Sequence, residues 1–561
     1  MFKILILLLF LCLGVNLLPA TGQKTSYLIA PDKLYVDAND QDYKNVKPGD
    51  TLLFAAGNSK YLLIKNFRGE PGKPIVMINS GGEVIIDTDH YFGISIQNCR
   101  YFKFTGSGDP KQTYGFKIKR VANGAGMGIG DLSSDFEIDH VSIENCLIAG
   151  IYAKTDPDCA PETARSAFTQ YNTNIHDNYI ANTGDEGMYI GSSKYFGQTV
   201  NCDGKDLLIL PGLLEGVKIY NNIIDHSGSD GIQVGSASKN CLIYNNTVLF
   251  DSQLEKESQM SGIMIGGGSK CDCYNNFISQ GKGNGIESHG LGSYRIFNNI
   301  IADAGLSFQP ADPTQMKHGI FVTDVSVQSD SSFYIQHNNI INPKSEGIRF
   351  SSIKSKKNLI ASNIIINPGN YDYYQNGNTS FTGNDAYIMF QYSESEAMIK
   401  NNYLARNANT VGFSSGTMKS AADFKLTAGS PMINGADVDK MIRFDFSGRP
   451  RPNGIYSDIG AFEYDGITSS TRRLNNLSGQ IQLLQNPAKE FLIFSLPEKS
   501  NSEVFLNIYN LSGKMILQIK QTEISIERHT IQASLSKIAA GIYVYTICTG
   551  EYASAGKFIK L

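Results

Sequence analysis

One short motif recurs along most of the chain and constrains the fold more than any other feature. Its first half reads apolar-x-apolar-x-Asn-Asn-x-apolar, and its second half, after a variable gap, reads Gly-apolar-x-apolar. Clear first halves hold Asn221-Asn222, Asn245-Asn246, Asn275-Asn276, Asn298-Asn299, Asn338-Asn339 and Asn401-Asn402, and second halves begin at Gly150, Gly187, Gly231, Gly262, Gly285, Gly319 and Gly347. The shortest spacings between second Asn residues are 24 (222 to 246), 23 (276 to 299) and 24 (339 to 363).

This period fits one coil of three short strands. Alternating strands with Gly or Asn at the corners, and no amphipathic helix between them, argue against leucine-rich and helical repeats. In stacked coils each strand lies about 4.8 Å from its equivalent, so parallel sheets form. The recurrent Asn predicts a ladder of side-chain amides at one corner, where Asn also tolerates the left-handed backbone of a tight bend. The sequence therefore predicts an all-β solenoid.

Composition excludes one class of partner. The chain has 561 residues, more than one ordinary core supports, but each coil of a solenoid buries its face against its neighbours. With 49 Lys+Arg against 53 Asp+Glu the net charge is −4, so we expect no nucleic-acid binding. Trp is absent, so stacking on sugars requires Tyr or Phe. We expect a monomer.

The first residues predict export. Lys3 precedes an apolar run, and Ala20-Thr21-Gly22 supplies small residues before a cut at Gln23, so residues 1–22 are predicted to be a signal peptide. No later apolar run has the length of a membrane span. Eight cysteines remain after the cut, in a compartment that permits disulfides, and none has the spacing of a zinc site.

Given these repeats, residues 24–424 resemble right-handed parallel β-helix proteins of the pectate-lyase-like kind. Residues 46–54 and 72–77 are similar to the opening coils of such proteins. The resemblance implies a right-handed parallel β-helix solenoid over residues 23–425, with a polysaccharide bound in a groove along it. It says little about chemistry, because a fold does not determine a function.

Two further segments resemble known modules. Ser430-Pro431, Gly448-Arg449-Pro450 and Asp458-Ile459-Gly460 are similar to the choice-of-anchor Q motif, so residues 426–464 are expected to close the open end of the solenoid, with Arg449 and Asp458 in structural roles. A linker is expected at 465–480. Residues 481–561 resemble a type IX secretion C-terminal sorting domain, a small β-sandwich, on motifs such as Asn486-Pro487 and Gly541-Ile542-Tyr543. This resemblance implies the type IX machinery as a partner, and a protein secreted by or attached to the outer surface of a Gram-negative bacterium.

The repeat also predicts an exposed column of side chains. Residues one and three places after each repeat Gly point inward, so the residue between them points outward. The predicted column is Tyr152, Tyr189, Gln233, Met264, Glu287, Phe321 and Arg349, with Lys154, His289 and Thr323 two places further along their strands. Six steps of about 4.8 Å make the column roughly 29 Å long, enough for several sugar units, and Tyr152, Tyr189, Gln233 and Phe321 are candidate substrate-binding residues.

Insertions on both sides of this column are expected to form walls along it. Segments 251–261, 304–318 and 369–384 precede the Gly strand, and segments 155–171 and 192–215 follow it. Cys159 and Cys202 lie in the two following segments, on adjacent coils, and we predict that they form a disulfide. Cys241 and Cys271 occupy equivalent inward positions, for which we expect packed thiols rather than a bond.

Elimination from a uronic acid requires a base beside the substrate carboxylate and a cation that offsets the developing charge. Lys154, His289, His318 and Tyr189 are candidate bases, Arg349 is a candidate carboxylate ligand, and Glu287 is placed to orient His289. We therefore favour a polysaccharide lyase, with His289, Arg349, Lys154 and Glu287 as catalytic candidates.

Two alternatives remain open. Glu186 and Asp230 directly precede the repeat Gly on adjacent coils, so they are candidates for the carboxylate pair of a glycoside hydrolase or for ligands of Ca²⁺. Acidic residues also suit such a turn without any chemical role. A non-enzymatic glycan-binding adhesin is the third hypothesis, because the solenoid and the sorting domain suffice for it.

Overall fold

The computed structural model describes residues 25–310, 315–369, 386–437, 442–465, 481–495, 504–510, 515–519, 524–527, 530–549 and 552–561. The predicted signal peptide, nearly all of the predicted linker and most of segment 369–384 lie outside this description. The chain divides into two compact units, residues 1–466 and 467–561. In the described part of the chain, no helix has the length and apolar character needed to cross a membrane.

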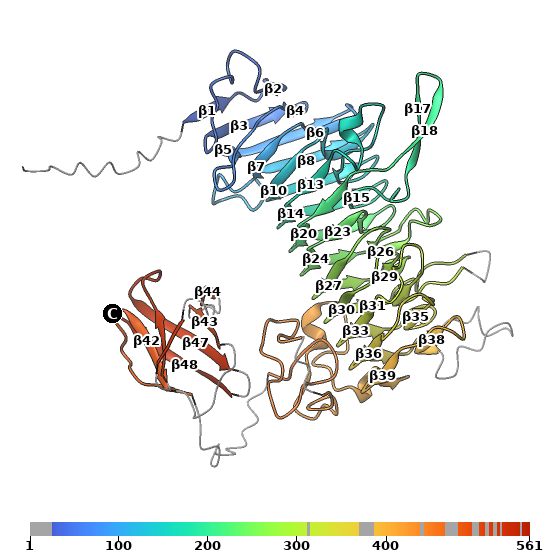
Figure 1. Ribbon diagram of the computed structural model, residues 1–561, viewed down its shortest axis with the longest axis vertical. Coiled ribbons are helices and arrows are strands. Elements are labelled where there is room, and N and C mark those ends of the chain that lie inside the picture. The colour runs from blue at the N-terminus through green and yellow to red at the C-terminus, as the bar shows by residue number, and fades with distance from the viewer. Residues whose placement is uncertain are drawn as a thin grey trace, which may run out of the picture. The chain divides into compact units, whose positions relative to one another are not determined.

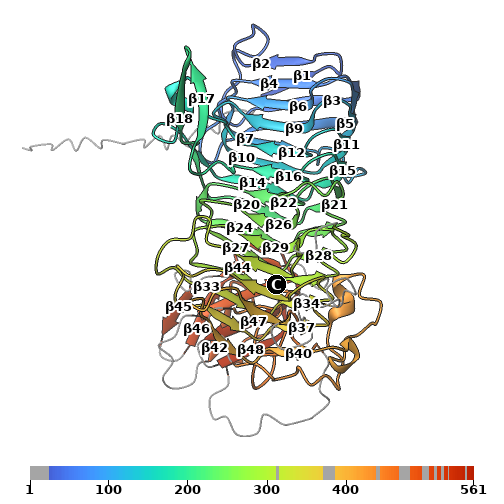
Figure 2. The same ribbon diagram turned by 90° about the vertical axis from the view of Figure 1, so that its right-hand side faces the viewer.

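The larger unit is a right-handed parallel β-helix (Figure 1). One of its sheets has twelve parallel strands among the described residues, stacked one above the next in Figure 2. In spatial order they are β2 (Tyr35–Asp37), β4 (Leu62–Lys65), β6 (Phe92–Gln97), β9 (Ala125–Gly130), β12 (Ile151–Ala153), β16 (Met188–Ile190), β22 (Ile232–Val234), β26 (Ser261–Ile265), β29 (Asn284–Ser288), β32 (Ile320–Val322), β35 (Ile348–Phe350) and β38 (Ile388–Phe390). We call this the groove sheet.

A second sheet, which we call the ladder sheet, contains two ladders of parallel strands joined through the long strands β3 (Thr51–Ser59) and β5 (Ile75–Thr88). One ladder holds β7 (Arg100–Thr105), β10 (Ser134–Asp139), β14 (Thr173–His176), β20 (Lys218–Tyr220), β24 (Cys241–Tyr244), β27 (Cys271–Tyr274), β30 (Tyr294–Phe297), β33 (Phe333–Gln336), β36 (Leu359–Ala361) and β39 (Met398–Lys400). The other holds β8 (Phe116–Val121), β11 (Val141–Cys146), β15 (Tyr179–Thr183), β21 (Ile223–Ser227), β25 (Thr247–Leu249), β28 (Phe277–Ser279), β31 (Ile300–Ala302), β34 (Asn339–Ile341), β37 (Ile364–Ile366) and β40 (Tyr403–Ala405), and the opening strands are β1 (Ser26–Ile29), β3 (Thr51–Ser59) and β5 (Ile75–Thr88).

Smaller elements surround the coils. A short parallel sheet joins β13 (Thr169–Tyr171), β19 (Leu213–Glu215) and β23 (Ala237–Lys239), and β17 (Gln198–Cys202) pairs with β18 (Lys205–Ile209) as an antiparallel hairpin. Single 3-10 turns occur at Pro161–Thr163, Ala408–Thr410 and Ala421–Phe424.

The repeat sequence explains the coil. Inward residues such as Ile232, Ile263 and Ile286 stack in register and are fully buried, each contributing roughly 2 kcal/mol of transfer free energy. The repeat Gly has a steric origin: a Cβ on Gly187 or Gly231 would lie 2.5 Å from the carbonyl oxygen of the Gly on the next coil. Any side chain at these positions would push the coils apart.

The predicted amide ladder is confirmed. Each ladder Asn donates from Nδ2 to Oδ1 of the next at 2.8–3.0 Å, in the order Asn178, Asn222, Asn246, Asn276, Asn299, Asn338, Asn363 and Asn402. The residue before it takes the left-handed conformation, with φ of 56° at Asn221 and 55° at Asn275. One register differs from the prediction: Asn338, not Asn339, is the ladder residue, and His337 takes the positive φ.

Beside this ladder the outer face of β14, β20, β24, β27 and β30 carries stacked rings. His176, Tyr220, Tyr244, Tyr274 and Phe297 follow one another at centroid separations of 4.5–5.0 Å and interplanar angles of 14° or less. Because the rings cover one another's faces, this stack stabilises the sheet and leaves little ring face for a sugar.

Residues 386–437 and 442–465 complete the larger unit. Phe424, Met432 and Phe462 pack on Ile341 and Ile364, so the contacts run along the side of several coils, whereas the sequence led us to expect a cover on the open end. Within residues 442–465, Arg451 forms a buried ion pair with Glu463 at 2.9 Å, and Arg449 pairs with Asp465. Asp458 has a structural role, accepting the backbone N–H of Asn434 and of Tyr464.

The smaller unit is a β-sandwich of two antiparallel sheets. One sheet orders β41 (Gln482–Leu483), β42 (Phe491–Ser495), β46 (Thr530–Ser534) and β45 (Ile524–Glu527), and the other orders β44 (Met515–Ile519), β43 (Val504–Tyr509), β47 (Gly541–Thr549) and β48 (Tyr552–Lys560). Leu492, Phe494, Leu506 and Phe558 form its buried core.

Candidate functional site

The predicted outward column exists in register on the groove sheet. Each pair of adjacent strands from β12 to β35 aligns the expected residues, from Tyr152 beside Tyr189 to Phe321 beside Arg349. The column is not uniformly open, because Gln233 and Met264 are only 6% and 5% exposed. The remaining five side chains are half-buried.

The described part of the larger unit contains one predicted and one unpredicted disulfide. Cys159 and Cys202 are bonded, with a Cα–Cα distance of 5.6 Å, and so tie two long segments together. Cys241 and Cys271 are also bonded, so the prediction of packed thiols was wrong. Parallel pairing sets these two residues directly beside each other, with 4.4 Å between their Cα atoms, which brings the thiols within bonding range.

A cation lies between two aromatic rings at one end of the column. The Lys154 Nζ is 4.3 Å from the ring centroid of Tyr189 and 5.6 Å from that of Tyr152, and it pairs with Asp156 at 2.9 Å. Aromatic side chains and an ammonium on a half-buried surface can contact the ring and the carboxylate of an acidic sugar.

Beside this cation lies a row of buried carboxyl groups. Glu186 and Asp230 are 1% and 0% exposed, and Glu186 accepts a hydrogen bond from Gln259 of segment 251–261. Burial, with the nearby charge of Asp185, raises the pKa of Glu186 to about 7. Burial and the neighbouring charges of Glu287 and Glu186 raise the pKa of Asp230 well above its usual value. Burial likewise raises the pKa of Asp251 to about 6.

The centre of the column holds a histidine and carboxylate dyad. The Nε2 atom of His289 lies 2.8 Å from Oε1 of Glu287, and Ser261 and Asn284 donate to Oε2 of the same carboxylate. Burial acts to raise the pKa of Glu287, but these hydrogen bonds outweigh it and hold the pKa below its usual value. Glu287 is therefore an ionised group in direct contact with His289.

Lys317 adds a cation that sequence reasoning did not select. Its Nζ lies 5.2 Å from the ring centroid of Phe308, and its charge interacts with those of Glu287, Asp230 and Asp251. Burial lowers the pKa of Lys317, which those carboxylates only partly offset.

Arg349 occupies a third cluster. Its Nη1 lies 3.2 Å from Oε1 of Glu346, and Nδ1 of His318 lies 2.6 Å from the other oxygen of that carboxylate. Burial acts to raise the pKa of Glu346, but His318 and Arg349 hold it below its usual value. Glu346 directly precedes Gly347, as Glu186 and Asp230 precede theirs, so the repeat could have identified it.

The four catalytic candidates are thus not brought together. His289 and Glu287 touch, but the order of the groove sheet puts Lys154 four strands away, about 19 Å, and Arg349 two strands away on the other side, about 10 Å. A polysaccharide along the column reaches all of them, whereas a single sugar unit does not.

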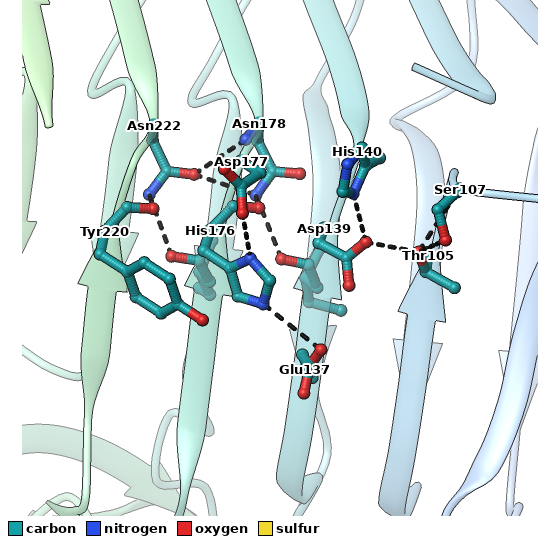
Figure 3. Close-up of polar contacts among 12 residues, drawn as sticks. Thr105, Ser107, Glu137, Asp139, His140, His176, Asp177, Asn178, Tyr220 and Asn222 are labelled. Carbon is teal, nitrogen blue, oxygen red and sulfur yellow. Dashed lines mark hydrogen bonds and ion pairs between the residues drawn. The ribbon is translucent and has the colours of Figure 1, made fainter. Parts of the chain in front are cut away.

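A further polar cluster lies on the other sheet (Figure 3). Glu137, Asp139 and His176 place potential metal-ligand atoms within 4.8 Å of one another. The ammonium of Lys103 lies 2.8 Å from Asp139 and also pairs with Glu137, so an internal cation already occupies this cluster. The hydrogen bond with His176, together with Lys103, lowers the pKa of Glu137 to about 2 in spite of burial.

Comparisons with known proteins agree with this architecture. Residues 215–386 match the family model described as right handed beta helix region, and residues 485–561 match that of the secretion system C-terminal sorting domain. No curated protein matches the chain.

Several solved structures are similar to the chain at low identity. Pectate lyase Pel9A shares 13% identity at a TM-score of 0.41, over 79% of this chain and 97% of that one. A mutant of the PL6 family alginate lyase AlyGC shares 15% at a TM-score of 0.39, over 83% and 61%. The catalytic unit of a GH87 alpha-1,3-glucanase from Streptomyces thermodiastaticus shares 11% at a TM-score of 0.32, over 70% and 71%. From its coils and the two family models, the chain is a right-handed parallel β-helix protein with a C-terminal secretion sorting domain.

Proposed function

We propose that the protein binds an acidic polysaccharide along the groove sheet and cleaves it by β-elimination at His289. The observation that carries the proposal is the contact of 2.8 Å between Nε2 of His289 and Oε1 of Glu287, in the middle of an outward column. A histidine oriented by an ionised carboxylate is a suitable general base. The sorting domain supports a protein that acts outside the cell.

In this proposal His289 removes the proton from the carbon beside the substrate carboxylate. The electron pair forms a carbon-carbon double bond, the glycosidic C–O bond breaks, and the leaving oxygen takes a proton from solvent. Lys317 offsets the charge that develops on the carboxylate, because its ammonium lies close enough to Glu287 for their charges to interact. Lys154, Tyr152 and Tyr189 bind a sugar unit about four strands away.

Hydrolysis by the acidic row is the second candidate function. A glycoside hydrolase needs one protonated and one ionised carboxyl group. Burial raises the pKa of Asp230 well above its usual value and that of Glu186 to about 7, so Glu186 changes its protonation state near neutral pH.

The test is to incubate the purified protein with acidic and neutral polysaccharides, following ultraviolet absorbance and reducing ends together. We expect both signals to rise on an acidic substrate. His289→Ala should lower kcat by about a thousandfold, and Lys154→Ala should raise KM with little change in kcat. His226→Ala is the matched control, since His226 also pairs with a neighbouring carboxylate, at 2.6 Å from Asp225, but on the other sheet.

Two outcomes would contradict the proposal. Reducing ends without ultraviolet absorbance would indicate hydrolysis. Retention of polysaccharide without any product would indicate an adhesin.

A further inference from the structure

A separate pocket of 330 Å³ opens where β7, β10 and β13 begin. Its lining includes Arg100, Arg165, Tyr101, Tyr171, Ser134 and Ser166. Arg165 belongs to segment 155–171, which leaves the groove sheet after Lys154. The size of the pocket suits one sugar unit.

Two guanidinium groups line this pocket, and backbone carbonyls hold both. Nε of Arg165 donates to the carbonyl oxygen of Pro211 at 3.0 Å, its Nη2 donates to that of Tyr195, and Nε of Arg100 donates to that of Leu132. Neither arginine forms an ion pair with a carboxylate in the described ranges. Carbonyls fix a guanidinium in place without cancelling its charge.

The carboxylate of Asp135, the acidic residue in the lining, already accepts hydrogen bonds from two neighbours. Oδ1 of Asp135 accepts from Nδ2 of Asn172 at 2.6 Å, and its Oδ2 accepts from the Ser134 hydroxyl at 2.8 Å. Burial lowers the pKa of Arg165, yet a guanidinium stays protonated at neutral pH. With two cations and one anion in its lining, the pocket carries a net positive charge.

The rest of the lining suits a sugar. Tyr171 is 44% exposed and offers a ring, while Tyr101 and Ser166 carry hydroxyl groups. The disulfide between Cys159 and Cys202 and the contacts of Arg165 hold the segment that forms this wall.

We propose that this pocket binds one acidic sugar unit through its anionic group, a carboxylate or a sulfate ester. Arg100 and Arg165 receive the anion, and Tyr171 packs against the sugar ring. The site does not depend on the elimination proposed above, because it shares no residue with the column. A polysaccharide held here and in the groove is bound at two places, which raises the effective concentration of its chain at the groove.

The experiment is calorimetric titration of the full-length protein with galacturonate, glucose 6-sulfate and glucose. We expect binding of at least one anionic sugar and none of glucose. Arg100→Gln and Arg165→Gln should each weaken binding by about tenfold, as the loss of a charge-assisted hydrogen bond predicts. Because Arg165 also holds its segment in place, Tyr171→Ala is the variant that leaves those contacts intact, and it should weaken binding by about threefold.

Controls separate this site from the groove. Arg120→Gln removes an exposed arginine that pairs with Asp87 and Asp89, and this variant should bind the sugar as the wild type does. Binding of galacturonate alone assigns a uronate, and binding of the sulfated sugar alone assigns a sulfate ester. The proposal is overturned if neither anionic sugar binds, or if Arg100→Gln and Tyr171→Ala bind like the wild type. Arg100→Gln should retain elimination at saturating substrate, whereas His289→Ala should retain binding here.

Discussion

Glu137 and Glu186 lie on adjacent coils of one β-helix, yet their carboxyl groups behave in opposite ways. Glu137 on the ladder sheet contacts His176 and Lys103, and its pKa falls to about 2. Glu186 beside the groove sheet is buried next to Asp185 and Asp230, and its pKa rises to about 7. Glu186 is 1% exposed, whereas the Glu137 side chain is 35% exposed and contacts two cationic partners, so the difference comes from the burial and the partners of each carboxylate.

The two sheets differ in how their charged groups are partnered. Paired charges on the ladder sheet satisfy one another and keep the carboxylate of Glu137 ionised at neutral pH. The groove side instead keeps two carboxyl groups with few partners, a lowered lysine pKa and a histidine, within a few strands of each other. Perturbed titration of this kind is concentrated at functional sites more often than elsewhere.

The largest expected effect comes from Glu186→Gln. The pKa of Glu186 is raised from 4.5 to about 7 in the folded protein, because burial disfavours the ionised carboxylate. The preference of the folded state for the protonated carboxyl group therefore contributes fully to stability below pH 4.5, and this contribution is lost as the pH rises through 7. At pH 8 the variant should be more stable than the wild type by about 3 kcal/mol, and at pH 4 the two should be alike. Urea denaturation at both pH values measures this.

Glu394→Gln, at an exposed position, is the control and should leave the free energy of unfolding unchanged at both pH values. Equal stability of wild type and Glu186→Gln at pH 8 would contradict the prediction. A rise in Tm with Ca²⁺ that Glu186→Gln or Asp230→Asn abolishes would show instead that the pair holds a cation.

A smaller effect is expected from Lys103→Met on the ladder sheet. The substitution removes the ammonium beside Asp139, which is 1% exposed, and should lower the free energy of unfolding by about 2 kcal/mol at pH 7. Without the ammonium, Glu137, Asp139 and His176 keep their ligand atoms within 4.8 Å, so Zn²⁺ should raise the Tm of this variant and not that of the wild type. Unchanged stability would show that Lys103 contributes no net free energy.

The smallest effect is expected from Glu137→Gln, with the opposite sign and pH window to Glu186→Gln. The folded pKa of about 2 lies below the usual 4.5, so the contribution of this carboxylate is present above pH 4.5 and is lost as the pH falls toward 2. Since the side chain is 35% exposed, solvent screening limits the loss at pH 7 to about 1 kcal/mol. Stability curves of variant and wild type should converge near pH 2, and a constant difference across this range would contradict the assignment.

Much of the scaffold of the candidate site could be predicted from the sequence. Alternation around the repeat Gly predicted the column from Tyr152 to Arg349, and the placement of Cys159 and Cys202 on adjacent coils predicted their bond. Both follow from local periodicity, because stacked coils turn equivalent positions into neighbours about 4.8 Å apart.

Predictions failed where the answer depended on atomic contacts across coils. His337 replaced Asn at the bend and moved the ladder register by one residue, and Cys241 and Cys271 proved close enough to bond. Gln259 hydrogen-bonds Glu186 across 73 residues of sequence, and Glu346 pairs with both His318 and Arg349. No periodicity encodes such partners.

The sequence by itself thus determined the coil, the face that each repeated side chain occupies, and the presence of a sorting domain. These properties depend on short-range alternation and on motifs that are continuous in the chain. Only the tertiary structure decided which carboxyl groups are paired, which are buried without a partner, and where two arginines meet in one pocket. Charge and pKa depend on distances of a few ångströms between side chains from different coils and insertions, and those distances exist only after the chain has folded.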